Sequence, residues 1–287
     1  MKRILSITAI ALTTSCFAQN VSNKVTFPNG KKIELTSQVS SVISQEMMGQ
    51  SMESKVNATV TRLFTVQNAT ASNASIKHQI NRMQMTMESP MGAQSFDSDN
   101  PKDIQSDAGK EVAKTLNTKY SMDVDPTGKI TAVKLDSNTA KAASSKDESN
   151  MLANALSGIV EGLNVPKVGD RSDFKILQDK DISKGTSWTD SLQNGLATFT
   201  VSNINDTAVF VTYKGTGSME RKQEMMGQEI TITSKDTTSG TIIIDRKTGL
   251  LKSNTSTTDS KGSMEAMGQT IPMNTKTTRT ITARIKD

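Results

Sequence analysis

Methionine is the residue type in this sequence whose number and spacing could carry a binding function. The 287 residues contain 16 methionines but only 7 phenylalanines, 2 tyrosines and 1 tryptophan. Met83, Met85 and Met87 alternate along the chain, so they share one face of any β-strand they form. Thioether side chains suit irregular apolar surfaces and also soft metal ions such as Cu(I). Three roles are therefore open: filling a core poor in aromatic residues, lining an apolar surface for a lipid or partner protein, or binding copper.

A short motif that contains methionine recurs along the chain. Glu-Met-Met-Gly-Gln at 46–50 recurs at 224–228, and looser copies lie at 90–94 and 266–269. A glycine between two strand-like segments suits a tight hairpin, where the backbone takes a positive φ. Each copy is predicted to be a hairpin tip, and the repeat favours two duplicated halves, about 24–135 and 170–287. The candidate ligand-binding residues are Met83, Met85, Met87, Met225 and Met226.

Catalytic chemistry finds little support in the sequence. His78 is the sole histidine, so no second histidine can complete a zinc site, and a Ser-His-Asp triad would have to use this one. It lies between Ile76 and Ile80 in a strand-like segment, which favours a half-buried structural role. Nucleophile-elbow and P-loop motifs are absent from the sequence. We expect a non-enzyme without a cofactor, and we assign no metal ligands.

Two aspartate-containing segments, 123–129 and 245–250, are predicted to be hairpin loops. Asp123 and Asp125 could open a calcium loop, but the remaining spaced acidic ligands and the closing glutamate are missing. Pro-Thr-Gly and Lys-Thr-Gly are instead typical turn sequences. Trp188 is expected to pack against the sheet rather than to anchor a ligand.

Most of the chain shows the alternation of apolar and polar residues that is typical of half-buried β-strands. In the segment 56–66, Val56, Val60 and Phe64 fall on one face and threonines fall on the other. Gly215-Thr216-Gly217 is predicted to be a short loop between two strands. Further strand-like segments are 32–47, 75–88, 197–204, 207–214, 217–226, 229–236, 240–245, 250–258 and 276–286.

Two segments have helical periodicity instead. Residues 103–117 place Ile104, Val112 and Leu116 at helical spacing, and residues 147–163 carry a wide apolar stripe after an acidic start. The predicted fold is therefore mainly β, of the α+β class. We expect a single β-rich domain at 19–287, built as a curved antiparallel sheet or incomplete β-barrel with two helices packed on it.

The N-terminus has the features of an export signal. Lys2 and Arg3 precede a short apolar run, and Ala18 is a suitable cleavage residue, so residues 1–18 are predicted to be a signal peptide. The apolar run is shorter than the ~20 residues of a membrane-spanning helix, and no later segment reaches that length. The mature protein is expected to be periplasmic or secreted, without a transmembrane span. The alternative is a lipoprotein acylated at Cys16, the one cysteine.

The charge distribution argues against nucleic acid as a partner. The formal net charge is +5, but lysines and arginines are scattered among acidic residues, and aromatic residues make up only 3% of the chain. A nucleic-acid-binding protein usually shows a basic stripe with stacking aromatics.

Several motifs together resemble a known family. They are Met-Met-Gly-Gln at 47–50, Asp-x-Asp-x-x-Gly-Lys at 123–129, Val-Pro at 165–166 with Val-Gly-Asp at 168–170, Gly-x-x-Trp at 185–188 and Asp-x-x-Thr-Gly-Leu at 245–250. The chain resembles a family of exported Gram-negative bacterial β-rich proteins known only as a domain of unknown function. The resemblance implies an uncharacterised envelope protein and brings no catalytic residues with it. A non-catalytic binding or structural module with a Met-lined surface is the function we expect, and a periplasmic copper-binding protein is the alternative.

Overall fold

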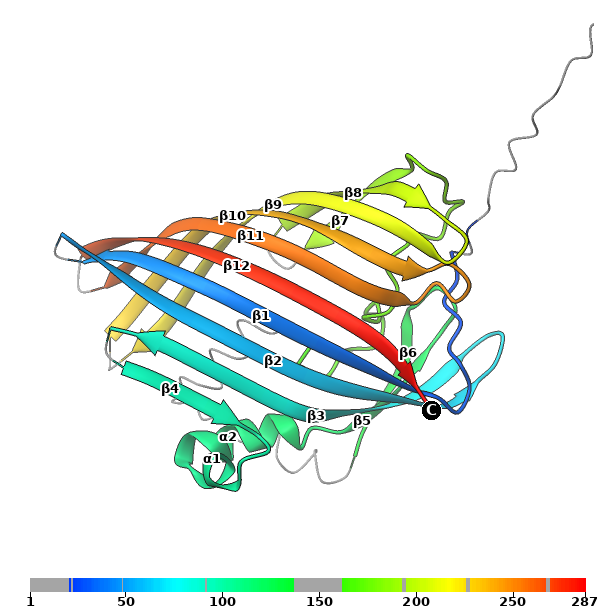
Figure 1. Cartoon of the computed structure of the whole chain (residues 1–287), viewed down its shortest axis with the longest axis horizontal. Coiled ribbons are helices and arrows are strands. Elements are labelled where there is room, and N and C mark those ends of the chain that lie inside the picture. Colours follow the sequence, from blue (N-terminus) through cyan, green and yellow to red (C-terminus); the bar gives the residue numbers. More distant parts are fainter. Residues whose placement is uncertain are drawn as a thin grey trace, which may run out of the picture.

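The structure is a computed structural model that describes residues 21, 23–136 and 162–287, apart from positions 48, 91, 193–194, 226–227 and 267–268. It consists of one twelve-stranded antiparallel sheet and two short helices (Figure 1). The prediction of a curved antiparallel sheet with few helices is thereby confirmed. In chain order the elements are β1 (Lys32–Met47), β2 (Gln50–Ala69), β3 (Ala74–Ser89), β4 (Gly92–Asp97), α1 (Pro101–Gln105), α2 (Asp107–Leu116), β5 (Tyr120–Val124), β6 (Ile130–Leu135), β7 (Ser187–Leu192), β8 (Gly195–Ile204), β9 (Ala208–Met225), β10 (Gln228–Asp245), β11 (Leu251–Ala266) and β12 (Gln269–Lys286).

The first and last strands lie side by side in the middle of the sheet. The strand order is β6-β5-β3-β2-β1-β12-β11-β10-β9-β8-β7, and β4 pairs with β3 beside this path. β1 runs antiparallel to β12 from Lys32 opposite Lys286 to Gln45 opposite Met273. Within the described part of the chain, β6 and β7 are not paired with each other, so the sheet is open.

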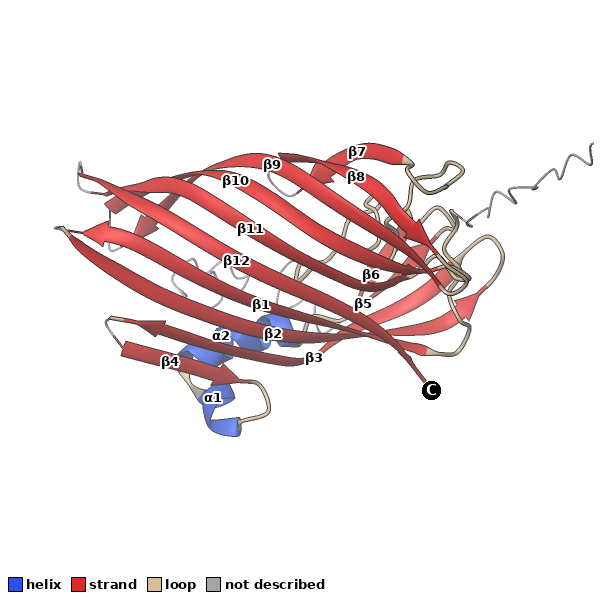
Figure 2. Ribbon diagram, turned by 45° about the horizontal axis from the view of Figure 1, so that its top comes forward, coloured by secondary structure: helices blue, strands red, loops and turns tan. Residues whose placement is uncertain are grey.

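One face of the sheet, which we call the inner face, carries the core. Buried and more exposed residues alternate along β2, because successive side chains of a strand point to opposite faces. The pairing register continues this face from strand to strand: Val60 of β2 lies opposite Ser37 of β1 and Met83 of β3, and all three are buried. The sheet is curved, α2 lies beside β3, and α1 lies beside β4 (Figure 2).

Four hairpins turn at the same end of the sheet, which we call the tip end (left in Figure 1). The last residue pairs of these hairpins are Met47 with Gln50, Ser89 with Gly92, Met225 with Gln228, and Ala266 with Gln269. The turn that each of these pairs closes falls within a copy of the methionine motif, and Gly49 has the expected positive φ of 75°. The prediction of hairpin tips is confirmed, and the fold gathers all four at one end. The duplication of two halves stays a prediction.

The opposite end, which we call the closed end, is held by residues 23–30 and by residues 162–182. We call the segment 162–182 the strap. The N–H of Val25 donates to the carbonyl of Pro126, and that of Thr26 donates to the carbonyl of Thr248. The N–H of Leu251 in turn donates to the carbonyl of Phe174 in the strap. These bonds fix the loops that follow β5 and β10, and both loops are the predicted hairpin connections.

The strap contributes to every part of the core. The buried residues form three clusters, and the strap supplies Leu163 to one, Phe174 to another, and Leu177 with Ile182 to the third. Burying one large apolar side chain stabilises a fold by about 1.5–3 kcal/mol. The strap therefore packs against both edges of the sheet, the one that contains β5 and β6 and the one that contains β7 and β8. Its apolar side chains connect these edges, which are not paired with each other in the described residues.

The predicted helix at 103–117 is present but divided in two. Ser106 ends α1 and caps α2, where its hydroxyl accepts a hydrogen bond from the N–H of Gly109. Serine is a favoured helix N-cap, so the break has a local cause. Val112 of α2 is buried in the cluster that contains Met83 and Met85. The second predicted helix, 147–163, lies outside the described residues except for its last two positions, and the predicted signal peptide lies wholly outside them.

The prediction of a loop at Gly215-Thr216-Gly217 is wrong, because these residues lie within β9. A Cβ atom on Gly215 would lie only 2.6 Å from the carbonyl oxygen of Leu196, so the glycine permits a close approach of β8 and β9 rather than a turn. The predicted strands 207–214 and 217–226 are thus one strand. The segments 229–236 and 240–245 likewise form the single strand β10.

Candidate functional site

The three alternating methionines of β3 share the inner face. Met83 and Met85 are 0% and 2% exposed, and they lie in one core cluster with Val60 and Phe96. Met87 is half-buried and packs at the edge of that cluster. This location corresponds to the core-filling role for Met83 and Met85, and it leaves them no surface for a ligand.

The described residues do not include the side chains of the other two candidate ligand-binding residues, Met225 and Met226. The backbone of Met225 ends β9, but its side chain and the whole of Met226 lie outside the described residues. In the sheet order, β3 and β9 are separated by β2, β1, β12, β11 and β10.

A different set of methionines lines the inner face near the tip end. Along one row, Met52 of β2 lies opposite Gln45 of β1, which lies opposite Met273 of β12. In the next row Met264 lies between Ile271 and Ile232. We call this set the tip-end surface; its members, all half-buried, are Met52, Met219, Ile232, Met264, Ile271 and Met273.

The tip-end surface is apolar and partly open to solvent, unlike the core clusters. The side-chain N–H of Gln45 reaches the sulfur of Met273 at 3.6 Å. The same row continues through Gly262 and Ser234 to Met219, so Gln45 and Ser234 are its polar residues. Flexible thioether side chains adapt to irregular apolar ligands. Contiguous half-exposed apolar residues of this kind are typical of binding surfaces.

Sequence reasoning missed this surface because strand register decides it. Met52 and Met273 are 221 positions apart by number, and they become neighbours only because β1 pairs with both β2 and β12. The usable signal was the position of each methionine close to a copy of the tip motif.

His78 is the centre of a buried cluster at the closed end. It is 1% exposed, its ring stacks on Tyr120 with centroids 4.3 Å apart, and Phe64 covers it at 4.9 Å. Neither ring nitrogen has a hydrogen-bond partner among the described residues. The pKa of His78 falls to about 4, mainly because of burial and also because of the nearby charge of Arg62, while the charge of Asp173 opposes both effects. The imidazole is therefore neutral and sealed, and the predicted buried structural role holds, with deeper burial than expected.

Arg62 ties the strap to the sheet beside this histidine. Its side chain is 3% exposed and donates from Nη1 to Asp173 at 2.6 Å and to the carbonyl of Gly162 at 2.9 Å. Gly162 has a φ of 78°, and a Cβ atom there would lie 2.1 Å from the same Nη1 atom. The close approach of the Arg62 side chain explains why residue 162 is a glycine. The contacts of Arg62 with Asp173 and Gly162 connect the strap to β2.

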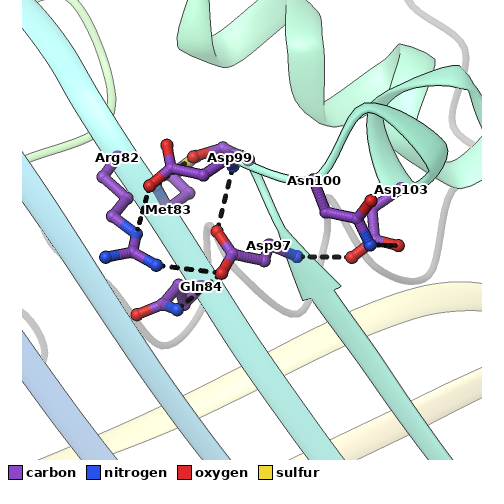
Figure 3. Close-up of polar contacts among 8 residues, drawn as sticks. Arg82, Met83, Gln84, Asp97, Asp99, Asn100 and Asp103 are labelled. Carbon is purple, nitrogen blue, oxygen red and sulfur yellow. Dashed lines mark hydrogen bonds and ion pairs between the residues drawn. The ribbon is translucent and has the colours of Figure 1, made fainter.

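A second polar network fixes α1 against the β3–β4 hairpin (Figure 3). Arg82 donates to Asp97 at 2.9 Å and forms an ion pair with Asp99 at 2.9 Å. The N–H of Asp97 donates to Asp103, and Asn100 caps the helix by accepting from the N–H of Lys102. The hydrogen bond from Arg82 is the main reason that the pKa of Asp97 falls to about 2. These carboxylates are occupied by structural contacts.

The other residues considered for chemistry also have structural contacts. The carboxylate of Asp125 accepts hydrogen bonds from the N–H and hydroxyl of Thr127 and from the N–H of Lys129, so the turn itself occupies it. Trp188 is 7% exposed and stacks on Phe199 with ring centroids 5.5 Å apart, which confirms that it packs, and it belongs to β7 of the sheet.

The outer face carries a shallow depression of ≈ 680 Å³. It is lined mainly by threonines of β8–β11, including the cross-strand row Thr200, Thr212, Thr241 and Thr255. Threonine favours exposed strand positions, and this preference accounts for the row without a ligand.

Within the described ranges, no group of three or more His, Cys, Asp or Glu side chains is placed to hold a metal ion. No helix in that part of the chain is long and apolar enough to cross a membrane.

A family of unknown function, DUF6263, matches residues 71–251, which is more than half of the 287 residues. The chain belongs to this family. The match confirms the resemblance to a family known only as a domain of unknown function, and it spans β3 to the start of β11. The exported, Gram-negative character of the family is a separate prediction.

No curated protein matches the chain. Among nine solved chains that match, one comes from a structure entitled "Lipid-protein interactions in lipovitellin". It is 11% identical, with a TM-score of 0.48, and the match covers 91% of this chain but only 26% of the lipovitellin chain. The COG4313 outer membrane channel from Pseudomonas putida F1 is 8% identical, with a TM-score of 0.24 and coverage of 91% and 98%. Both TM-scores lie below 0.5, so neither protein's ligand or role is transferred to this chain.

Proposed function

We propose that this protein is a non-catalytic binding module of the bacterial envelope that holds the acyl chain of a lipid against the tip-end surface. The observation that carries the proposal is the position of Met52, Met264 and Met273 on the inner face, half-buried and side by side with Ile232 and Ile271. A core residue would be sealed, as Met83 is, and a solvated strand would carry polar residues there.

The shape of the surface favours a flexible apolar ligand over an ion. Met52 on β2 and Met273 on β12 belong to one row, but β1 lies between their strands. Because neighbouring strands are spaced by about 4.8 Å, this row is spread along the sheet instead of converging on a point. A long acyl chain can run across such a row, and pliable methionines can follow its shape.

Binding is tested with a dansyl-labelled fatty acid titrated into the full chain. We expect saturable binding that weakens about tenfold or more in Met273→Glu, because a carboxylate on this surface opposes an apolar chain and must itself be desolvated. The matched control is Asn274→Glu, on the adjacent exposed position of the outer face of β12, which should bind as the unaltered protein does.

The absence of saturable binding in the unaltered protein, or equal weakening in both variants, would contradict the proposal. Native mass spectrometry of protein purified from the envelope identifies the occupant directly. Bound lipid supports the proposal, whereas bound copper or a co-purified protein at this surface would replace it.

Location in the envelope depends on processing of the N-terminus. We expect the exported protein to begin at Gln19, because cleavage after Ala18 fits a leader peptidase site. The intact mass of protein recovered from the host envelope measures this. A mass that retains Cys16 with added acyl chains would show a lipoprotein instead, and an uncleaved mass would show that the segment is not a signal peptide.

A further inference from the structure

The chain holds two populations of methionine that differ in access to solvent. Met83 and Met85 are 0% and 2% exposed inside a core cluster. Met52, Met264 and Met273 of the tip-end surface are half-buried on the same inner face. The same molecule therefore contains methionine sulfurs that solvent can reach and methionine sulfurs that it cannot, and the second group serves as a comparison for the first.

We propose that the methionines of the tip-end surface are sites of reversible oxidation by peroxide, and that their sulfoxides switch off ligand binding. The sulfur lone pair of methionine attacks one oxygen of hydrogen peroxide. The S–O bond forms, the O–O bond breaks, and the departing hydroxide takes the proton from the oxygen that is now bonded to sulfur and leaves as water. Sulfur is oxidised by two electrons and peroxide is reduced by two.

Oxidation would change the polarity of this surface. A sulfoxide is polar, whereas the thioether is apolar, so oxidation of Met52, Met219, Met264 and Met273 turns an apolar lining into a polar one. Gln45 already directs its amide N–H towards the sulfur of Met273, at 3.6 Å, and this donor can bond a sulfoxide oxygen. The contact favours the oxidised form at that position.

The fold itself should survive the reaction. The sealed sulfurs of Met83 and Met85 are the ones whose oxidation would disrupt a core. The tip-end surface lies outside the three core clusters, because none of its methionines is a member of them. Loss of binding would therefore come without unfolding.

The first test maps oxidation in the folded full chain by peptide mass spectrometry during exposure to hydrogen peroxide. We expect Met52, Met219 and Met264 to oxidise about tenfold or more faster than Met83 and Met85, because the rate follows access to the sulfur. Equal rates for the two groups, or faster oxidation of Met83, would overturn the assignment. This readout does not require any ligand.

The second test measures binding of the dansyl-labelled fatty acid before and after oxidation, with far-ultraviolet circular dichroism to follow the fold. This part rests on the proposed function. We expect about a tenfold loss of affinity with an unchanged spectrum, and recovery after treatment with the two stereospecific methionine sulfoxide reductases. Undiminished binding by the oxidised protein would overturn the switch, whereas no binding before oxidation would overturn the proposed function alone.

A leucine variant separates sulfur chemistry from surface shape. Leucine keeps the apolar volume of methionine and cannot be oxidised. The affinity of a variant with leucine at Met52, Met219, Met264 and Met273 is measured before and after peroxide, and peroxide should leave the variant's own affinity unchanged. The matched control carries Met83→Leu and Met85→Leu, and it should lose binding on oxidation as the unaltered protein does. Protection by the control variant would assign the effect to the core instead.

Discussion

Replacing Phe174 with alanine is expected to lower the free energy of unfolding by about 3–5 kcal/mol, the usual cost of removing a large buried aromatic side chain. Phe174 is 0% exposed, and its ring meets Phe64 at 4.9 Å and Phe27 at 5.6 Å, both edge-on. The loss combines apolar burial, these aromatic contacts and the cavity left behind. Urea unfolding at neutral pH measures it.

The matched control for this change lies in the same strap. Val168 is 64% exposed, so Val168→Ala should alter the free energy of unfolding by no more than about 0.5 kcal/mol. A similar effect from both changes, or an effect of Phe174→Ala below about 1 kcal/mol, would show that the strap is not part of the cooperative core.

Acid is expected to destabilise the protein through His78, by about 3 kcal/mol between pH 7 and pH 4. In the folded protein the pKa of His78 is about 4, whereas an exposed histidine has a value of 6.5. The unfolded chain therefore binds the proton first as the pH falls. The stability is fully present above pH 6.5 and is lost progressively towards pH 4.

His78→Phe isolates this effect, since phenylalanine keeps an aromatic ring between Phe64 and Tyr120 and cannot titrate. Urea unfolding of both proteins at pH 7 and pH 4 gives the comparison, because acidic groups common to both cancel. We expect the unaltered protein to lose about 3 kcal/mol more than the variant. Parallel losses would mean that His78 is not buried in its neutral form. Any variant too unstable to fold can be replaced by His78→Gln, which is also uncharged.

Local patterns predicted most strands and all four hairpin tips. Alternation in 56–66 identified the centre of β2, and the copies of the methionine motif marked the places where four pairs of neighbouring strands end together. Local patterns failed where long-range geometry overrides them. Gly215 has the composition of a turn, yet it continues a strand because β8 passes close to it. Ser106 divides a continuous helical pattern because its side chain caps a new helix.

The sequence allowed us to predict the chemical character of the proposed binding surface but not which methionines form it. The sequence indicated an apolar, methionine-lined surface, and it favoured Met83, Met85 and Met87 because their alternation is visible locally. Alternation identifies a shared face but not what covers it, and α2 together with β4 seals the first two residues. The tip-end surface depends on the pairing of β1 with β12, which no local pattern encodes.

The pairing of β1 with β12 also determines when the sheet can be completed. Lys32 at the start of β1 pairs with Lys286 at the end of β12. Because the ribosome makes the N-terminus first, almost the whole chain must be synthesised before β1 can pair with β12. Until then β1 and β11 both present unpaired backbone edges, which are sites for non-native strand addition. Such long-range closure slows folding. A chain truncated before β12 would leave the sheet as two separate pieces, β6-β5-β3-β2-β1 and β11-β10-β9-β8-β7, each with a long edge exposed to aggregation.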